Sequence, residues 1–212
     1  MVKVLDFGYI KFIESWGSDE RVIEAARMST DGGFRGWDEE CSLCEGKGKY
    51  IGLVDHHPWC EVDCYKCGKT GRISKDAKLL RYLWEHKHHT PFEMGGMVCE
   101  VQAPIFIARE WFRHRTQSFN ELSGRYSTLP NLFYCPSLER LRTGKQSSKN
   151  KQGSEDGFSE VDAINFRQDI IEATARARVT YEHLLEKGVA RELARLVIPV
   201  NQYTRFRASA NL

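Results

Sequence analysis

The sequence lacks several features that would place it in a specialised class of protein. No run of apolar residues is long enough to span a bilayer, and residues 1–6 carry neither the basic nor the apolar stretch of a secretory signal. Neither sign of charge is in excess, since 31 Lys and Arg face 29 Asp and Glu. We therefore expect no membrane partner, and any site for an anion must come from local clustering of cations.

Hydrophobic residues make up 41% of the chain, which is enough to bury a core within a single compact domain. Apolar periodicity and breaker residues predict an α+β fold, an antiparallel sheet with flanking helices. Helices are expected from about residue 18 to the break at 31–33 and over about 76–90, 105–115, 160–186 and 190–197. Strands are expected over about 2–13, 97–103 and 200–210.

Helix ends can be placed from single residues. Ser18 and Ser159 are candidate N-caps, and Gly188 is placed to stop the longest helix. Pro104 suits the first turn of the helix that follows it. Residues 142–157 are rich in Lys, Ser, Gln and Gly, which predicts a mobile loop.

Five of the seven cysteines fall between residues 41 and 67, where glycines interrupt any helical period. We interpret residues 38–74 as an insert in a core formed by 1–37 and 75–212. Clustered cysteines without a secretory signal are typical of a metal site in a reducing compartment, so we expect a cytoplasmic protein.

The insert contains two C-x-x-C pairs, and this spacing presents two thiolates from each pair to one tetrahedral zinc ion. The predicted ligands are Cys41, Cys44, Cys64 and Cys67. With the glycines after each pair, the pattern resembles the zinc modules of J-domain chaperones, the second repeat being imperfect. The alternatives are unmetallated thiols, an iron–sulfur site, or replacement of one ligand by Cys60, His56 or His57. Four thiolates leave no open coordination position, so the metal would fold the insert or support a contact surface rather than catalyse.

The densest chemistry lies in residues 113–126, where three arginines and a histidine accompany Asn, Glu and Ser. Planar guanidinium groups suit phosphate, and the polar side chains suit ribose or a base edge. Residue types alone leave three interpretations open: a solvated helix end followed by a polar loop, a nucleotide site, or a nucleic-acid site.

The order R-H-R followed by S-x-N-E-x-S-x-R-Y resembles the signature of flavin-dependent thymidylate synthases. The resemblance continues over most of the chain outside the insert. Further similar segments are 88–93, 103–109, 190–195, Pro199 and 201–206.

The resemblance implies the fold of that family and the synthesis of dTMP from dUMP. Methylenetetrahydrofolate gives the methylene group, FAD gives the hydride, and NADPH reduces the flavin. Active sites would form between subunits of a homotetramer.

The resemblance also implies a role for individual residues, and His88 would lie beside the flavin. The residues expected to bind FAD are Thr90, Arg113, His114, Arg115, Glu121 and Asn211. Those expected to bind dUMP are Glu110, Trp111, Phe112, Arg113, Glu121, Leu122, Ser123, Gly124, Arg125 and Arg195. The residues expected to act in catalysis are His88, Arg113 and Arg195. We read His86 as a helix-end histidine, and Glu192 as a partner in a structural ion pair.

Three features depart from the family pattern. Glu110 stands where Gln is usual, and Met94 where His is common. The sequence also stops at Leu212. The family continues with a helical segment that carries more flavin contacts and an arginine that polarises the uracil ring. We therefore expect a shortened chain, a chain completed by a second polypeptide, or a subunit without activity.

A competing interpretation is a zinc-ribbon protein that binds nucleic acid through Arg113, Arg115, Arg125 and the lysines of the insert. The near-balanced charge weighs against it, because phosphate contacts usually come with a broad basic face.

Overall fold

A computed structural model describes the backbone of residues 1–54, 57–73 and 76–211. Side chains are described over the same ranges, except for those of residues 53–60. The chain divides into two compact units, which are described separately below. The first comprises residues 1–14 and 98–210, and the second comprises residues 15–97 with the C-terminal end from 211. Of the expected limits of the insert, 38 lies inside the second unit and 74 lies outside the described residues, so both stay a prediction.

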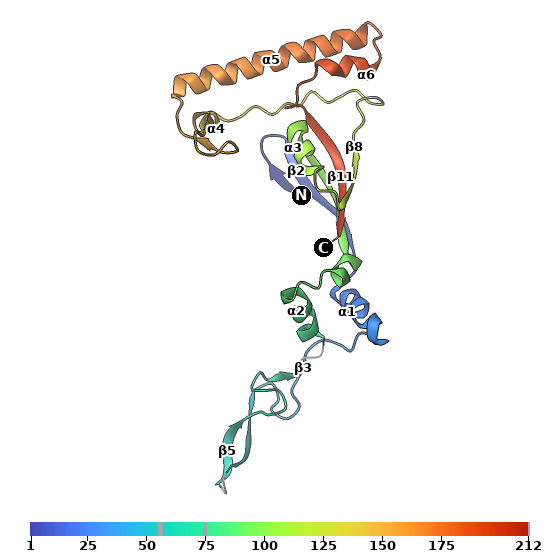
Figure 1. Cartoon of the computed structure of the whole chain (residues 1–212), viewed down its shortest axis with the longest axis vertical. Coiled ribbons are helices and arrows are strands. Elements are labelled where there is room, and N and C mark those ends of the chain that lie inside the picture. The colour runs from blue at the N-terminus through green and yellow to red at the C-terminus, as the bar shows by residue number, and fades with distance from the viewer. Residues whose placement is uncertain (55–56, 74–75, 212) are drawn as a thin grey trace. The chain divides into compact units, whose positions relative to one another are not determined.

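A five-stranded sheet forms the centre of the first unit (Figure 1). Its strands lie in the order β1 (Val2–Val4), β2 (Gly8–Trp16), β7 (Gly96–Pro104), β11 (Tyr203–Asn211) and β8 (Gln117–Glu121). The pairs β1–β2 and β8–β11 are antiparallel. This arrangement of helices and antiparallel strands confirms the predicted α+β class, although β8 was not predicted.

Helix α3 (Ile105–Trp111) packs on this sheet. The buried core consists of Val101 and Ala103 from β7, Ala108 from α3, and Phe206 and Ala208 from β11. Pro104 precedes the helix as its N-cap rather than lying in the first turn. The helix ends at Trp111, four residues before the predicted end.

The longest helix, α5 (Glu160–Glu186), begins and ends as predicted. The Ser159 hydroxyl accepts the Asp162 amide while the Asp162 carboxylate accepts the Ser159 amide, which completes a capping box. Gly188 follows with a φ of +79°, in the left-handed region that favours glycine. The predicted short helix is α6 (Arg191–Ala194), continued by the 3-10 turn η3 (Arg195–Val197).

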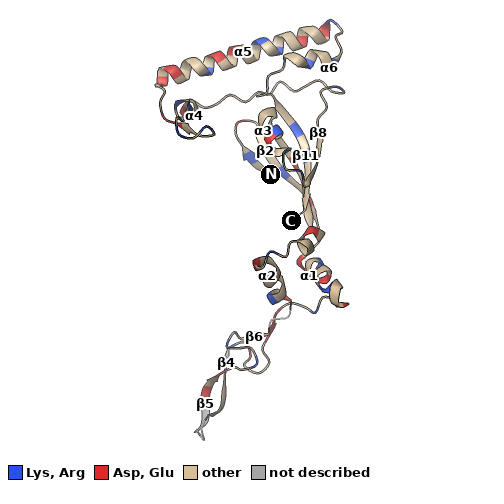
Figure 2. Cartoon of the chain, in the orientation of Figure 1, with Lys and Arg blue, Asp and Glu red and all other residues tan. Residues whose placement is uncertain are grey.

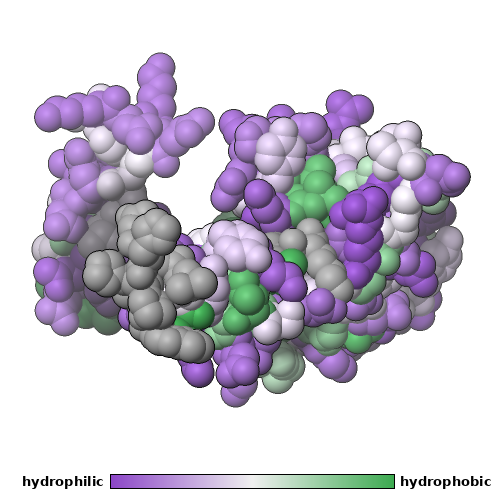
Figure 3. All heavy atoms as spheres, turned by 90° about the horizontal axis from the view of Figure 1, so that it is seen from below, coloured by the Kyte–Doolittle hydropathy of each residue, from purple (hydrophilic) through white to green (hydrophobic). Residues whose placement is uncertain are grey.

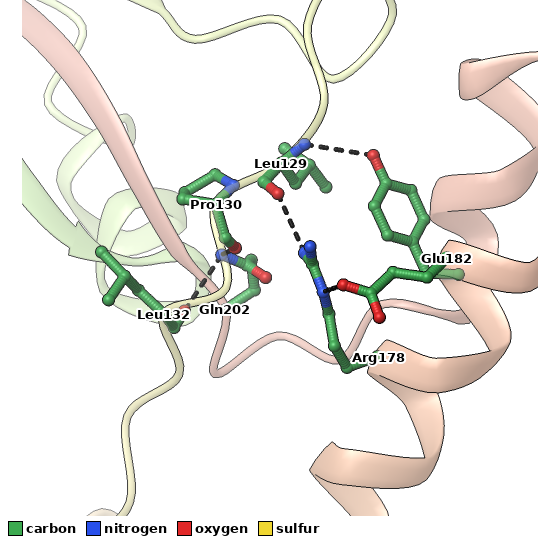
Figure 4. A network of polar contacts seen from close by, with 7 residues as sticks. Leu129, Pro130, Leu132, Arg178, Glu182 and Gln202 are labelled. Carbon is green, nitrogen blue, oxygen red and sulfur yellow. Dashed lines mark hydrogen bonds and ion pairs between the residues drawn. The ribbon is translucent and has the colours of Figure 1, made fainter. Parts of the chain in front are cut away.

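Polar contacts fasten α5 to the segment that follows β8, and Gln202, just before β11, binds the same segment (Figure 4). The Tyr181 hydroxyl accepts the Leu129 amide at 3.1 Å, and Arg178 donates to the Leu129 carbonyl at 2.9 Å. Buried Gln202 donates to the carbonyls of Pro130 and Leu132 at 2.8 and 3.0 Å. These bonds set the path of the chain at the start of β11.

The stretch from 138 to 155 contains more structure than the predicted loop. It holds α4 (Leu138–Arg142) and a hairpin of β9 (Lys145–Gln146) and β10 (Ser154–Glu155). The Ser137 hydroxyl accepts the Arg140 amide at 3.1 Å and so caps α4. The side-chain amide of Gln146 donates to carbonyls between the two strands, which closes the hairpin.

The second unit begins with α1 (Asp19–Arg27), capped by Ser18 as predicted, and the turn η1 (Met28–Thr30). Helix α2 (Ala77–Glu85) and the turn η2 (Thr90–Met94) follow the cysteine-rich region. That region forms two small pairs of strands, β3 (Glu39–Glu40) with β6 (Arg72–Ile73) and β4 (Lys49–Val54) with β5 (His57–Asp63).

The surface is mixed in polarity. On the face drawn in Figure 3, hydrophobic residues appear in small groups between hydrophilic ones. Among the described residues, no helix combines the length and apolar character needed to cross a membrane.

Candidate functional site

The basic motif forms a turn at the end of α3. The amides of Arg113 and His114 donate to the carbonyls of Glu110 and Trp111 at 3.1 and 3.0 Å, so the turn continues directly from the helix. Arg113, His114 and Arg115 are exposed. Within the described part of the chain, neither arginine takes part in an ion pair. The turn therefore presents two guanidinium groups that are open to an anion.

Aromatic packing holds this turn in place. Phe112 lies against Phe119 and Phe206, with ring centroids 4.7 and 4.9 Å apart. The Trp111 ring packs edge-on against Phe206, and its indole N–H donates to Gln117 at 2.9 Å. The rings of Trp111 and Phe112 thus serve the core, and their predicted contact with substrate remains a prediction.

Strand β8 carries the second half of the motif to its site. Glu121 lies opposite Phe206 in the β8–β11 register, and the next residue, Leu122, donates its amide to the Arg205 carbonyl at 2.8 Å. The Glu121 carboxylate accepts the Thr204 hydroxyl at 2.6 Å. Glu121 therefore has a fixed position, while its side chain remains exposed.

Residues after β8 meet the segment around η3. A Cβ added to Gly124 would lie 3.3 Å from Cδ of Arg195, so the glycine backbone contacts that side chain closely. Arg125 is paired with Glu192 at 3.2 Å, as expected for a structural ion pair. The Ser123 hydroxyl accepts the Arg125 amide at 3.2 Å. Four of the predicted dUMP-binding residues, 123–125 and Arg195, are thus brought together from two distant parts of the sequence.

A depression of about 360 Å³ lies beside β8 and β11. It is lined by the predicted residues Glu121 and Leu122, by Asn120 of the predicted motif, and by four residues that we did not predict. The latter are Glu100, Arg205, Phe206 and Arg207. The spacing of the two arginines was an available signal, because residues i and i+2 of a strand share one face.

Glu100 is the acidic centre of this depression. It accepts the Tyr9 hydroxyl at 2.9 Å and lies 3.8 Å from Arg207. Burial and the bond to Glu100 raise the pKa of Tyr9, which favours the protonated phenol that donates to Glu100. The depression therefore offers both hydrogen-bond donors and cations to a polar ligand.

The remaining predicted residues, His88, Thr90 and Asn211, belong to the second unit. All three are exposed. His88 lies near Tyr82, with ring centroids 6.0 Å apart, and Thr90 opens η2. His86 stacks on Tyr82 at 4.0 Å, in keeping with a helix-end role. Contact of His88, Thr90 and Asn211 with the arginine turn stays a prediction.

The four predicted metal ligands converge in the second unit. The Sγ atoms of Cys41, Cys44, Cys64 and Cys67 all lie within 4.8 Å of one another. His56 lies outside the described residues, as do the side chains of His57 and Cys60. Cys99 and Cys135, which lie outside this region, are half-buried.

The thiols in this cluster differ in acidity. Burial raises the pKa of Cys41, but hydrogen bonds from the amides of Cys44 and Leu43 and from neighbouring thiols outweigh it, and the pKa falls to about 7. Burial raises the pKa of Cys44 to about 11, against the opposing bond from the Gly48 amide. Because like charges repel at such short range, ionisation of one thiol disfavours ionisation of its neighbour.

Comparison with known proteins gives a consistent result. The family described as "Thymidylate synthase complementing protein" matches residues 11–212. A flavin-dependent thymidylate synthase of Thermus thermophilus is 38% identical over 205 residues, which are 97% of this chain and 60% of that protein. The enzyme of the same name from Wolbachia pipientis is 37% identical over 204 residues, which are 96% of this chain and 58% of that enzyme.

A solved structure is also similar. The crystal structure of the UMP/dUMP methylase PolB from Streptomyces cacaoi, bound with 5-Br dUMP, has a TM-score of 0.68 and 28% identity. The match covers 99% of this chain and 76% of that one. The match takes in most of this chain, but the chain spans only about 60% of the length of these curated relatives.

Proposed function

The chain belongs to the family of thymidylate synthase complementing proteins, and we propose on this premise that it takes part in flavin-dependent methylation of dUMP to dTMP. One observation carries the proposal. The arginine turn 113–115 and the segment 121–125 are both held by pairing and packing against β11, while their polar groups remain on the surface. Such a fixed set of cations and hydrogen-bonding groups suits anionic nucleotides.

The residues of the turn fit FAD. Arg113, His114 and Arg115 present donors suited to its pyrophosphate, and Glu121, Thr90 and Asn211 would complete its contacts. Bound FAD would supply a hydride, with NADPH as its reductant and methylenetetrahydrofolate as the source of the one-carbon group. The chain itself binds and orients these molecules.

The neighbouring residues would hold dUMP. Ser123, Gly124 and Arg125 offer a hydroxyl, close approach to the backbone and a cation, and Arg195 lies against Gly124. Negative charge that develops on the uracil ring is stabilised by such fixed cations. His88, Arg113 and Arg195 are the residues that we assign to catalysis, and Leu122, Trp111 and Phe112 support the pocket.

Glu110 would change the contact made at its position. It is exposed on α3, directly before the arginine turn. A carboxylate accepts hydrogen bonds and repels phosphate, so we propose that Glu110 meets a sugar hydroxyl or a base N–H rather than the phosphate.

We also propose that the chain acts as a homotetramer in the cytoplasm, with active sites built between subunits. Support for assembly comes from α5, which exposes Val161, Ile164, Ile171 and Val179. Their spacing places them within an arc of roughly 80° on one side of the helix. Cysteines clustered at the spacing of metal ligands in the second unit are in keeping with a reducing compartment such as the cytoplasm.

The nucleic-acid alternative has less support. Residues 38–73 carry five Lys and Arg against seven Asp and Glu. Lys49 is paired with Glu61 at 3.3 Å and Lys69 with Asp63 at 2.6 Å. Acidic and basic residues are interspersed along α5 as well (Figure 2). These elements do not form the broad basic face that phosphate backbones need.

Flavin and nucleotide binding test the proposal. Purified protein is expected to show flavin absorbance and to bind dUMP in calorimetry. Arg115→Ala should lose flavin, and Arg195→Ala should weaken dUMP binding. The control Arg21→Ala, on the surface of α1, should change neither. Well-folded protein that takes up neither FAD nor dUMP would contradict the proposal.

A further inference from the structure

We propose that Cys41, Cys44, Cys64 and Cys67 bind one Zn²⁺ ion, and that this ion replaces an apolar core in the module of residues 38–73. Distances between sulfur atoms support a single ion. The Cys41–Cys64 and Cys44–Cys67 pairs have Sγ atoms 3.6 and 3.7 Å apart. Four sulfurs placed tetrahedrally at about 2.3 Å from zinc lie about 3.8 Å from one another.

Disulfides do not account for this geometry, because bonded sulfurs are separated by about 2.05 Å. A four-iron cluster does not account for it either. Its cysteines bind four separate irons, which spreads their sulfurs farther apart than ligands of a single ion. The arrangement therefore favours one tetrahedral ion with sulfur ligands, for which zinc is the common occupant.

The two C-x-x-C turns hold each other in a reciprocal way. The Cys41 amide donates to the Gly71 carbonyl at 2.9 Å, and the Cys64 amide donates to the Gly48 carbonyl at 2.9 Å. Each turn thus fixes the first ligand of the other. This near-symmetry sets all four sulfurs around one point.

Backbone amides also approach the sulfur atoms. Gly48 donates to Cys44 and Gly71 donates to Cys67, each at 3.3 Å. Both glycines have a φ of +76°. A Cβ added to Gly48 would lie 2.3 Å from the carbonyl oxygen of Lys69. A Cβ added to Gly71 would lie 2.1 Å from the carbonyl oxygen of Gly46. Only glycine therefore permits both the turn and the N–H···S contacts, which stabilise thiolate charge next to a metal.

Among its described residues, the module has little else to bury. Its hydrophobic cluster consists of three buried cysteines, Cys41, Cys44 and Cys64, with partly buried Leu43, Tyr50, Cys67 and Ile73 around them. So small an apolar surface does not offset the entropy of ordering about 36 residues. Metal binding by the thiolates supplies the missing free energy of folding.

All four coordination positions are taken by cysteine, so water has no place on the ion. The site is structural and separate from the nucleotide chemistry. The base of the module is closed independently, since Asp76 donates its amide to Gly36 and its carboxylate accepts the Arg35 amide. Loss of the metal should therefore unfold the module and leave the rest of the chain folded.

Metal analysis of the whole protein tests the proposal without any variant. One zinc per chain is expected, and X-ray absorption at the zinc edge should show four sulfur neighbours at about 2.3 Å. Protein purified without bound metal, with iron, or with nitrogen or oxygen in the first shell would overturn it.

Variants test the assignment of the ligands. Cys44→Ser and Cys67→Ser are expected to release zinc to a chelator at least about tenfold faster than the unchanged protein. Limited proteolysis should then cut within 38–73. Cys135→Ser is the matched control, and Cys60→Ser tests the alternative ligand; both should retain zinc. Retention by Cys44→Ser, or loss by Cys60→Ser, would show that the ligand set is wrong.

Discussion

At the scale of single residues, Asp76 concentrates several interactions in one buried carboxylate. It is fully buried, accepts the Arg35 amide, and is paired with Arg27. Burial alone would raise the pKa of Asp76, but the Arg35 amide and the Arg27 guanidinium outweigh it and hold the pKa below its usual value. The folded state therefore favours the ionised form.

Replacing this carboxylate should destabilise the second unit. Asp76→Asn leaves Arg27 partly buried without its counter-charge, and the free energy of unfolding should fall by about 3 kcal/mol. Denaturant titration at neutral pH measures the change. Asp63→Asn, which breaks an exposed pair with Lys69, should lower the free energy of unfolding much less, because water screens that pair. Equal losses in the two variants would contradict this account of Asp76.

The same group predicts a dependence on pH. Because the folded-state pKa of Asp76 is lowered, its contribution is fully present above the unfolded pKa of about 3.9 and is lost as pH falls through the folded value. Unfolding midpoints measured from pH 7 down to pH 3 should decline less steeply for Asp76→Asn than for the unchanged protein. Parallel declines would exclude a role for this carboxylate in acid sensitivity.

A substitution at Gly124 tests whether the position of Arg195 matters for dUMP binding. In Gly124→Ala the new Cβ would lie 3.2 Å from Cδ2 of Leu129 and 3.3 Å from Cδ of Arg195, so the arginine must shift by a few tenths of an ångström. We expect dUMP binding to weaken roughly tenfold, about 1.4 kcal/mol in calorimetry. Gly33→Ala is the control, because its Cβ would meet nothing within 4 Å. Unchanged affinity in Gly124→Ala would separate Arg195 from the site.

At the scale of elements, local sequence signals predicted the ends of the longest helix, whereas the pairing of distant strands could not be predicted from the sequence. The Ser159 cap and Gly188 set both ends of α5, because each acts on residues beside it in the sequence. Strand β8 was missed since it becomes a strand only by pairing with β11, about 85 residues later. Glu100 was missed for the same reason, because it meets Arg205 and Arg207 only when β7 and β11 lie together in the sheet.

The capping box of α5 can be tested directly. Ser159→Ala removes the acceptor for the Asp162 amide and the partner of its carboxylate, so we expect a loss of about 1 kcal/mol in thermal unfolding. Faster hydrogen exchange should be limited to the first turn of α5. Ser147→Ala is the control, because Ser147 accepts amides within the hairpin turn rather than at a long helix. No measurable change in Ser159→Ala would argue that packing alone fixes this helix end.

At the scale of the whole molecule, the surface of α5 remains to be explained. One side of the helix is fastened by Arg178 and Tyr181 to the segment at Leu129. Next to this side, Val161 and Val179 are 66% and 65% exposed. Apolar side chains repeated along one helix face are typical of helices that pack against another subunit. This surface is the feature of the first unit that best supports the proposed homotetramer.

A charge placed on that surface should break the assembly. Light scattering should give a mass near four times 24.5 kDa for the unchanged chain, and a smaller one for Val179→Lys, because a buried lysine would lack a partner. Thr180→Lys is matched in position and charge. Thr180 is also exposed but points about 100° away around the helix, so this variant should keep the full mass.

Because active sites are proposed to form between subunits, Val179→Lys should also lose flavin while its circular dichroism stays unchanged. A variant that dissociates yet retains flavin would place the flavin site within one chain, and a tetramer that survives Val179→Lys would place the interface elsewhere than α5.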